Sequence, residues 1–115
     1  MQRTLDLALG LKTEWANFYG AMALPGSQLY RDAVAKGWRL PDSWAGYAPL
    51  GYDCVPLPTD TLTSEEILRF RDLAFLRYFG DPEYLAMILE KFGRPAVADM
   101  RAMLAVPIKR KILGY

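Results

Sequence analysis

Few side chains in this sequence could do chemistry, and most of those lie beside expected helix starts. The sequence contains no histidine, which removes the commonest general base and the commonest metal ligand. Its one cysteine, Cys54, has no Lys, Arg or His beside it, which favours an inert buried thiol over a nucleophile. Paired carboxylates occur only at Glu65/Glu66 and Asp81/Glu83, where helix capping explains them. We therefore expect no self-contained active site, and no metal site built by this chain alone.

Three weaker chemical signals each have a simpler structural interpretation. The turn Pro25-Gly26-Ser27 before a helix could hold an anion, but it has no neighbouring Lys or Arg, so a plain turn is favoured. Arginines at 69, 71 and 77 could pair with a ligand carboxylate, although a solvated or salt-bridged helix face is simpler. The basic tail at 109–111 is typical of a run that is solvated or that binds helix C-termini, and a net charge of +1 argues against a nucleic-acid partner.

Composition is typical of one globular domain. The 115 residues are 52% hydrophobic and 23% charged, which favours an ordered core over disorder. No run reaches the ~18 apolar residues of a membrane span, and the start of the chain lacks the pattern of a signal peptide. A single cysteine forms no internal disulfide, so the expected location is the cytoplasm. Seven Tyr and three Trp suit a helical core, or a surface that meets a partner or a flat ligand.

An apolar run at residues 14–24, followed by a turn and a helix, is the element around which we expect the chain to be organised. Such a nearly continuous run is typical of a buried parallel strand. Asn17 and Gly20 interrupt it, either through a solvent-facing side chain and a bulge or through close approach of a backbone or ligand. Ser27 predicts the N-cap of a helix that ends at Gly37. Because one strand is not stable alone, we expect its sheet to lie outside these residues.

The rest of the chain predicts an ordered connector between helices. Residues 38–62 are rich in proline and aromatic residues, and 52–57 predict a short edge strand. A short helix is expected at 2–11, before the first strand. Three more are expected to begin at the capping box Thr63-Ser-Glu-Glu66, at Asp81-Pro82 and at Arg94-Pro95.

The predicted fold is therefore mainly α with one or two short strands. A strand-turn-helix precedes a three-helix C-terminal bundle, and the whole is a fragment of an α/β barrel protein. The expected divisions are a last strand-helix unit of the barrel at 1–37, the connector at 38–62, and a helical C-terminal domain at 63–115.

Two stretches resemble a known family. The first is Asn17-Phe-Tyr-Gly-Ala-Met-Ala-Leu-Pro-Gly-Ser-Gln-Leu-Tyr30, followed by Ala33-Val-Ala-Lys-Gly37 and Leu40-Pro41. It resembles the last barrel strand and helix of radical S-adenosylmethionine enzymes. The second is similar to the C-terminal helical tail of the cobalamin-binding branch, which includes the anaerobic magnesium-protoporphyrin IX monomethyl ester oxidative cyclases. It comprises Leu57-Pro-Thr, Leu62-Thr-Ser-Glu-Glu, Phe70-Arg-Asp-Leu-Ala-Phe, Tyr78-Phe, Pro82-Glu-Tyr-Leu, Lys91-Phe-Gly93 and Lys109-Arg-Lys-Ile-Leu113.

The resemblance implies a parent oxidoreductase, cyclase or methyltransferase that uses a 4Fe–4S cluster, S-adenosylmethionine and cobalamin, with porphyrin or bacteriochlorophyll biosynthesis as one setting. This sequence lacks the Cys-x3-Cys-x2-Cys motif of that cluster, and Cys54 does not match it. By analogy of position, the residues near S-adenosylmethionine would be Asn17, Tyr19 and Met22. The residues closing the barrel mouth over substrate would be Trp44, Tyr47 and Tyr52.

The resemblance thus implies a C-terminal accessory domain that caps the barrel, contacts substrate or partner, and is not catalytic alone. Its partner would be the rest of the parent enzyme, with neither nucleic acid nor a membrane span involved. The alternative is a self-standing helical interaction module that homodimerises through the orphan strand. An independent enzyme that uses Cys54 is a more distant hypothesis.

Overall fold

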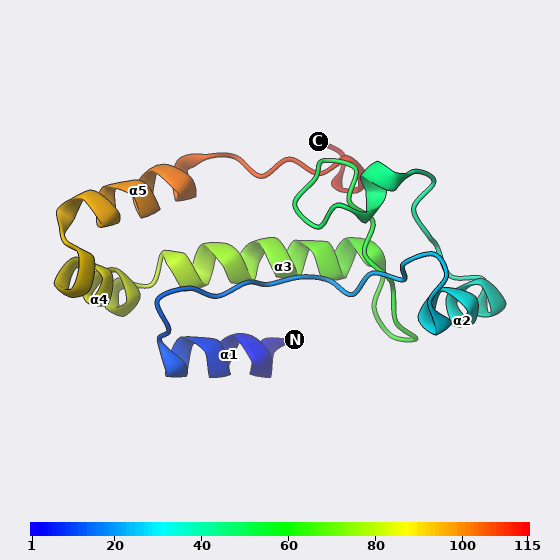
Figure 1. The fold of residues 1–115 in the computed structure, drawn as a ribbon, viewed down its shortest axis with the longest axis horizontal. Helices are drawn as coiled ribbons and strands as arrows, with labels where there is room; N and C mark the ends of the chain where they lie inside the picture. The colour runs from blue at the N-terminus through cyan, green and yellow to red at the C-terminus, as the bar shows by residue number, and fades with distance from the viewer. The chain divides into compact units, whose positions relative to one another are not determined.

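The computed structural model describes all residues 1–115 and contains helices but no strand, sheet or barrel (Figure 1). The α-helices are α1 (Gln2–Leu11), α2 (Gln28–Lys36), α3 (Ser64–Phe79), α4 (Pro82–Phe92) and α5 (Arg94–Ala105). Two short 3-10 helices complete the set, η1 (Trp44–Tyr47) and η2 (Lys111–Leu113). No helix combines the length and the apolar composition that crossing a bilayer requires.

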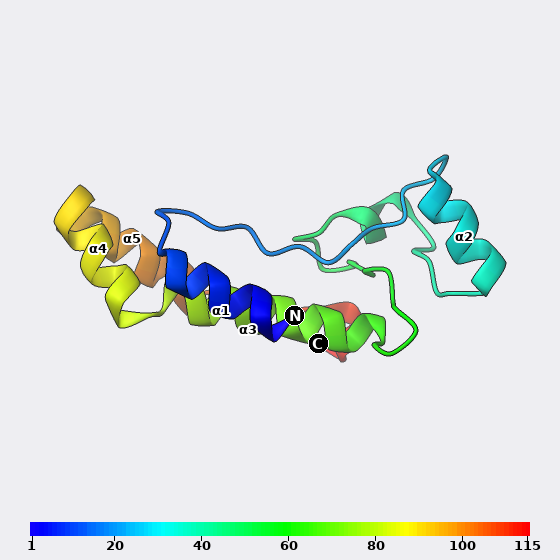
Figure 2. The ribbon, with the colours of Figure 1, turned by 90° about the horizontal axis from the view of Figure 1, so that it is seen from below.

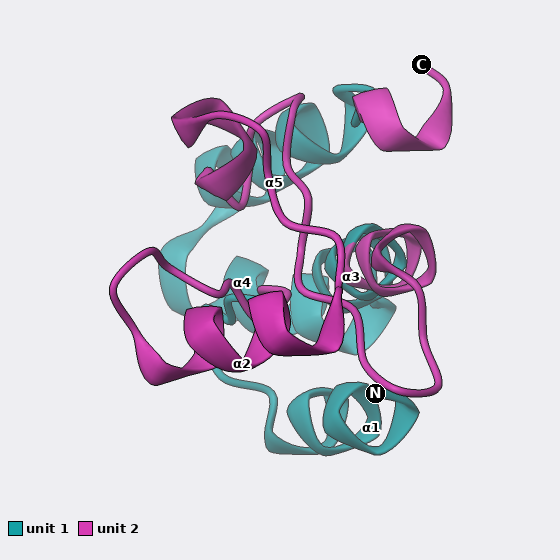
Figure 3. Cartoon of the chain, turned by 90° about the vertical axis from the view of Figure 1, so that its right-hand side faces the viewer, with its two compact units in different colours: residues 1–18, 72–108 teal, residues 19–71, 109–115 magenta.

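The chain divides into two compact units, which Figure 3 draws in different colours. Unit 1 comprises Met1–Phe18 and Asp72–Ile108, and unit 2 comprises Tyr19–Arg71 and Lys109–Tyr115. Helix α3 therefore contributes its first half to unit 2 and its last turns to unit 1. The expected three-part division into 1–37, 38–62 and 63–115 stays a prediction.

The predicted strand at 14–24 is wrong, and so is the barrel unit built on it. These residues have no regular secondary structure, and Figure 2 shows them as an extended coil. Their apolar side chains pack on helices instead of beside another strand. In unit 1, the Trp15 ring centroid lies 4.8 Å from that of Phe79, and Phe18 meets Tyr78 edge-on at 5.7 Å. An apolar run shows that side chains need cover, but a strand also needs a neighbouring backbone to pair with.

The predicted edge strand at 52–57 is also wrong. Pro56 removes one of the N–H donors that a ladder needs, Pro58 follows directly after the segment, and residues 52–57 stay irregular. In unit 2, Leu57 donates its N–H to the Ala21 carbonyl at 2.8 Å, and the Ser64 hydroxyl donates to the Pro56 carbonyl at 2.7 Å. These bonds fix the segment individually without making a sheet.

The predicted helix starts are confirmed by their capping bonds. Ser27 Oγ accepts from the Tyr30 N–H at 3.1 Å, and an Asp81 carboxylate oxygen accepts from the Tyr84 N–H at 3.0 Å. The capping box at α3 is reciprocal, because Thr63 Oγ1 accepts from the Glu66 N–H at 3.1 Å while Glu66 Oε2 accepts from the Thr63 N–H at 2.8 Å.

We expect Thr63→Ala to lower the free energy of unfolding by about 1 kcal/mol, because the first turn of α3 loses its capping oxygen. Urea denaturation followed by circular dichroism measures the change. Thr61→Ala is the matched control, because the hydroxyl of Thr61 caps no helix, and it should leave stability unchanged. Equal effects of the two substitutions would contradict the capping role.

Unit 1 has an aromatic core at the join between α3 and α4. Helices α4 and α5 pack directly against each other (Figure 1). The cluster at this join has five buried members, and side chains of α1, α3, α4 and α5 pack against it; the five are Tyr78, Phe79, Tyr84, Ile88 and Val97. The rings of Tyr78, Phe79 and Tyr84 lie 5.1–5.3 Å apart by centroid, in tilted or edge-on arrangements that aromatic pairs prefer.

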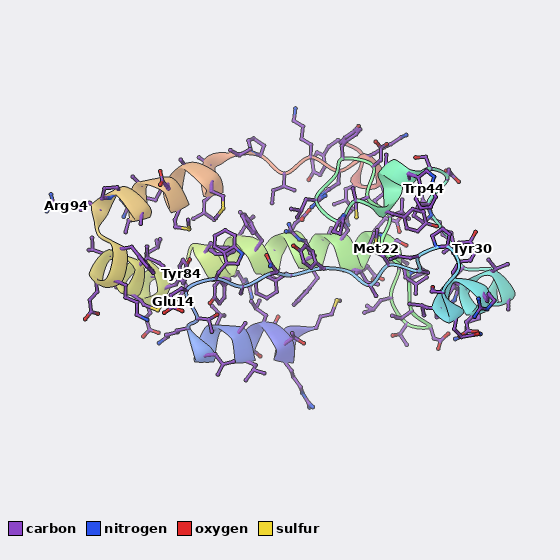
Figure 4. All side chains as sticks on the ribbon, in the orientation of Figure 1. Glu14, Met22, Tyr30, Trp44, Tyr84 and Arg94 are labelled. Carbon is purple, nitrogen blue, oxygen red and sulfur yellow. The ribbon has the colours of Figure 1, made fainter.

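Two buried tyrosines anchor the residues that follow α1. The Tyr84 hydroxyl donates to the Glu14 carbonyl at 2.9 Å, and the Tyr78 hydroxyl donates to the Thr13 carbonyl. Figure 4 labels Tyr84 and Glu14. Burial raises the pKa of Tyr84, since its phenolate would lose solvation. The Glu14 carboxylate also pairs with Lys91, whose hydrogen bond lowers the pKa of Glu14. The coil after α1 is therefore ordered by helix side chains.

Unit 2 has a smaller core. Its buried members are Ala23, Ala33 and Leu57, and Tyr30, Trp38 and Leu40 pack around them. The expected inward face of α2 is only partly correct, since Ala33 is buried while Leu29 and Val34 are exposed. Apart from Arg110 on the C-terminal tail, the remaining buried side chains of unit 2 lie on the connector and the first half of α3.

Candidate functional site

The residues assigned by resemblance to S-adenosylmethionine do not share one compact unit. Asn17 belongs to unit 1, where it is exposed and its side-chain oxygen accepts from Trp15 Nε1 at 3.1 Å. Tyr19 and Met22 belong to unit 2, with Tyr19 exposed and Met22 half-buried (Figure 4). The structure gives none of the three a contact with a catalytic group.

The connector presents the other predicted residues on an ordered loop of unit 2. Trp44 and Tyr47 lie together on η1 with ring centroids 5.8 Å apart, and Figure 4 labels Trp44. The Trp44 side chain is 77% exposed, and Leu50 and Tyr52 are also exposed. Tyr47 is half-buried, and desolvation raises its pKa. We call Trp44, Tyr47, Leu50 and Tyr52 the connector surface.

Buried backbone beneath the connector surface explains why so irregular a segment is ordered. Gly46 is buried, and a Cβ there would lie 2.5 Å from Pro41 Cβ, so only glycine fits. The Val55 N–H donates to the Gly46 carbonyl at 3.0 Å, closing the loop. Cys54 and Val55 are buried below it, as expected for an inert thiol.

Arg110 was missed by the sequence reasoning, which expected the basic tail to be solvated or to bind helix C-termini. Its side chain is only 1% exposed, and Nη1 donates to the Gly51 carbonyl at 2.7 Å and reaches the Pro49 carbonyl at 3.4 Å. The neighbouring Lys111 donates its N–H to the Tyr52 carbonyl at 3.0 Å. Apolar residues on both sides of the basic run, at 108 and 112–113, were the signal that the tail packs against something.

A shallow pocket of about 160 Å³ adjoins this loop in unit 2. Its lining comprises Arg39, Asp42, Ser43, Gly46, Asp53, Val55, Lys111 and Ile112. Both cations are paired, because Arg39 lies 2.9 Å from Glu65 and Lys111 lies 3.3 Å from Asp53. With its charges balanced in this way, the pocket has no strong field for an anion or a cation. Ser43 is the one hydroxyl of the lining, and the structure shows no hydrogen bond between it and the Asp42 or Asp53 carboxylate.

Unit 1 carries a second hollow, an open groove between α4 and α5. Its volume is about 360 Å³, and it is lined by Gly80, Pro82, Leu85, Ala86, Leu89, Val97 and Arg101. Arg101 is the one charged member of an otherwise apolar set. Such a groove suits the apolar face of another helix.

The chain's own residues do not fit an iron–sulfur cluster, because a single cysteine supplies one thiolate where the family motif supplies three. The structure also brings together no three His, Cys, Asp or Glu side chains that could hold a metal ion. Comparisons with protein-family models, curated proteins and solved structures found no match.

Proposed function

We propose that this chain is the helical C-terminal accessory region of a radical S-adenosylmethionine enzyme of the cobalamin-binding branch. It docks on the rest of that enzyme and supplies substrate or partner contacts, without a catalytic group of its own. The sequence resemblance of residues 17–30 and 57–113 suggests the family. The exposed Trp44 on an ordered loop is the single structural observation that supports a contact role.

An exposed indole on an ordered loop is costly unless something covers it. Apolar surface in water costs roughly 25 cal/mol per Å², and tryptophan and tyrosine are enriched where proteins meet partners. Trp44 is 77% exposed while the loop below it is held by a buried glycine and buried aliphatic side chains. Long ordered loops of this kind commonly carry binding residues. The connector surface therefore has the rigidity and the chemistry of a contact site.

In this proposal the radical reaction is catalysed by the rest of the enzyme. The cluster, S-adenosylmethionine and cobalamin would be held there, and the parent reaction would be of the oxidoreductase, cyclase or methyltransferase type. Asn17, Tyr19 and Met22 would approach S-adenosylmethionine only through the resemblance, whereas Trp44, Tyr47 and Tyr52 would contact substrate or partner. A cytoplasmic location goes with this proposal, because the lone cysteine forms no internal disulfide.

We expect the tagged chain to recover a protein with the Cys-x3-Cys-x2-Cys motif from an anaerobic lysate of the source organism. Trp44→Ala should reduce that recovery about tenfold or more, as loss of a central aromatic anchor does. Phe92→Ala is the matched control, because Phe92 is an exposed aromatic residue outside the connector, and it should recover the same amount. Mass spectrometry and iron analysis of the eluate measure both.

Two results would contradict the proposal. One is an eluate without a protein that carries the three-cysteine motif, together with flanking DNA that encodes none. The other is an iron–sulfur absorption band in the isolated chain after anaerobic reconstitution, since the chain would then hold a cluster by itself.

The groove between α4 and α5 favours a second candidate function, a helical interaction module that homodimerises. Leu89, which belongs to the apolar lining, is exposed, so the same surface of a second copy could pack against the groove. Light scattering over a dilution series tests the idea, with Leu89→Asp as the disrupting variant. A chain that stays monomeric at every concentration excludes it.

A further inference from the structure

We propose that residues 109–115 form a clasp that holds the connector surface in its binding conformation, with Arg110 as the positioning residue. The proposal rests on the proposed function in one respect, namely that the connector surface contacts a partner. The clasp itself is a property of unit 2 alone. It assigns a role to a tail whose composition predicts a basic run that is solvated or binds helix C-termini.

The burial of Arg110 is the first argument. A guanidinium that is 1% exposed has lost its hydration, and such a group persists only where hydrogen bonds replace the lost water. Here the replacing acceptors include the carbonyls of Gly51 and Pro49, on the turn that carries Leu50. Removing the guanidinium would leave the carbonyl of the half-buried Gly51 without this donor, so the turn would lose a hydrogen bond that fixes it.

Three more contacts join the tail to the same turn. The Lys111 N–H donates to the Tyr52 carbonyl at 3.0 Å, and the Lys111 ammonium lies 3.3 Å from Asp53. The Tyr52 hydroxyl donates to the Tyr115 carbonyl. Residues 49–53 thus bond to residues about sixty positions later, and Tyr52 of the connector surface makes two of these bonds itself.

A chain of backbone hydrogen bonds carries this restraint to Trp44. The Gly51 that accepts from Arg110 donates its N–H to the Ala48 carbonyl at 3.0 Å. The Ala48 N–H donates in turn to the Ala45 carbonyl at 3.2 Å, within η1 and next to Trp44. The position of the Trp44 indole therefore depends on the turn at Ala48–Gly51, which is hydrogen-bonded to Arg110.

Lysine is not equivalent to arginine in this role. Both bonds to the turn come from Nη1, whereas the ammonium of the shorter lysine side chain is a point charge that is more strongly hydrated and more costly to bury. Arg110→Lys keeps the charge and removes the planar guanidinium, so it separates positioning from simple charge. Arg110→Met removes both.

Hydrogen exchange of the full chain, with no partner present, tests the clasp. We expect Arg110→Met to lower the protection of the amides of Ala48, Gly51 and Val55 about tenfold or more, as local opening does, while amides of α4 and α5 keep theirs. Arg110→Lys should give an intermediate loss of protection in the same amides. If the methionine variant does not fold, the lysine variant is compared with the wild type instead. Lys109→Met, an exposed neighbour on the tail, is the matched control and should change neither set.

The clasp is overturned if both Arg110 variants keep wild-type protection in the connector, or if α4 and α5 lose protection equally. Recovery of the motif-bearing protein is then measured with the same variants, and Arg110→Lys should weaken it with Trp44 still in place. Normal recovery by a variant whose connector has opened would overturn the positioning role. Loss of connector protection in a chain that recovers no such protein would instead leave the clasp standing and refute the proposed function.

Discussion

Phe79→Ala is expected to lower the free energy of unfolding by about 3–5 kcal/mol, the largest effect of any substitution proposed for this chain. The Phe79 ring is 1% exposed and lies between 4.8 and 5.3 Å, by centroid, from the rings of Trp15, Phe75, Tyr78 and Tyr84. Truncation would leave a cavity at the centre of unit 1, because four rings on three segments cannot close on it together. Urea denaturation with circular dichroism measures the loss.

Phe92→Ala makes the same chemical change at an exposed position and serves as the control. Phe92 is 58% exposed at the end of α4, so we expect a change within about 0.5 kcal/mol. A similar loss for both phenylalanines would show that the aromatic cluster is not the core of unit 1.

Gly20→Ala is expected to destabilise the chain by about 1–3 kcal/mol, the second largest effect. A Cβ at Gly20 would lie 2.6 Å from Pro56 Cβ and 3.3 Å from Ile67 Cγ2. The proline ring cannot rotate away, and its neighbour Leu57 is fastened by its bond to the Ala21 carbonyl. The added methyl group must therefore push the coil away from the connector. Thermal unfolding and exchange of the Leu57 amide measure the effect.

Gly10→Ala should act in the opposite direction. Gly10 lies within α1, and a Cβ there meets nothing within 4 Å. Alanine in an open helical position is worth about 0.5–1 kcal/mol over glycine, so this variant should be more stable than the wild type. If both substitutions destabilise, steric contact with Pro56 is not the cause at Gly20.

The sequence was a good guide wherever the signal was local. The N-caps at Ser27 and Asp81 and the capping box at Thr63 each use a donor and an acceptor three residues apart, so nothing distant is needed to predict them. The Gly37 stop of α2 is equally local, because its positive φ of 68° suits glycine. Helices α2, α3 and α4 therefore begin at the capping residues that the sequence predicts, and α2 ends at the predicted glycine.

The candidate site was predictable only in its residue types. Tyr and Trp in the connector indicated a contact surface, and η1 does bring Trp44 and Tyr47 together. Which of these rings is buried could not be predicted from the sequence, because burial depends on which distant segments pack on the loop. Arg110 was missed for the same reason, since its acceptors lie about sixty residues earlier.

The sequence by itself determined where the helices begin and end, because capping bonds and helical periodicity act over one or two turns. Only the tertiary structure decided that residues 14–24 are a coil packed on helices, and that a basic tail residue is buried beneath a turn. The apolar run at 14–24 could have satisfied its side chains against a sheet or against helices, and its composition suits both. The choice depended on which distant aromatic rings and carbonyls were within reach, which is a property of the folded chain and not of any short stretch of it.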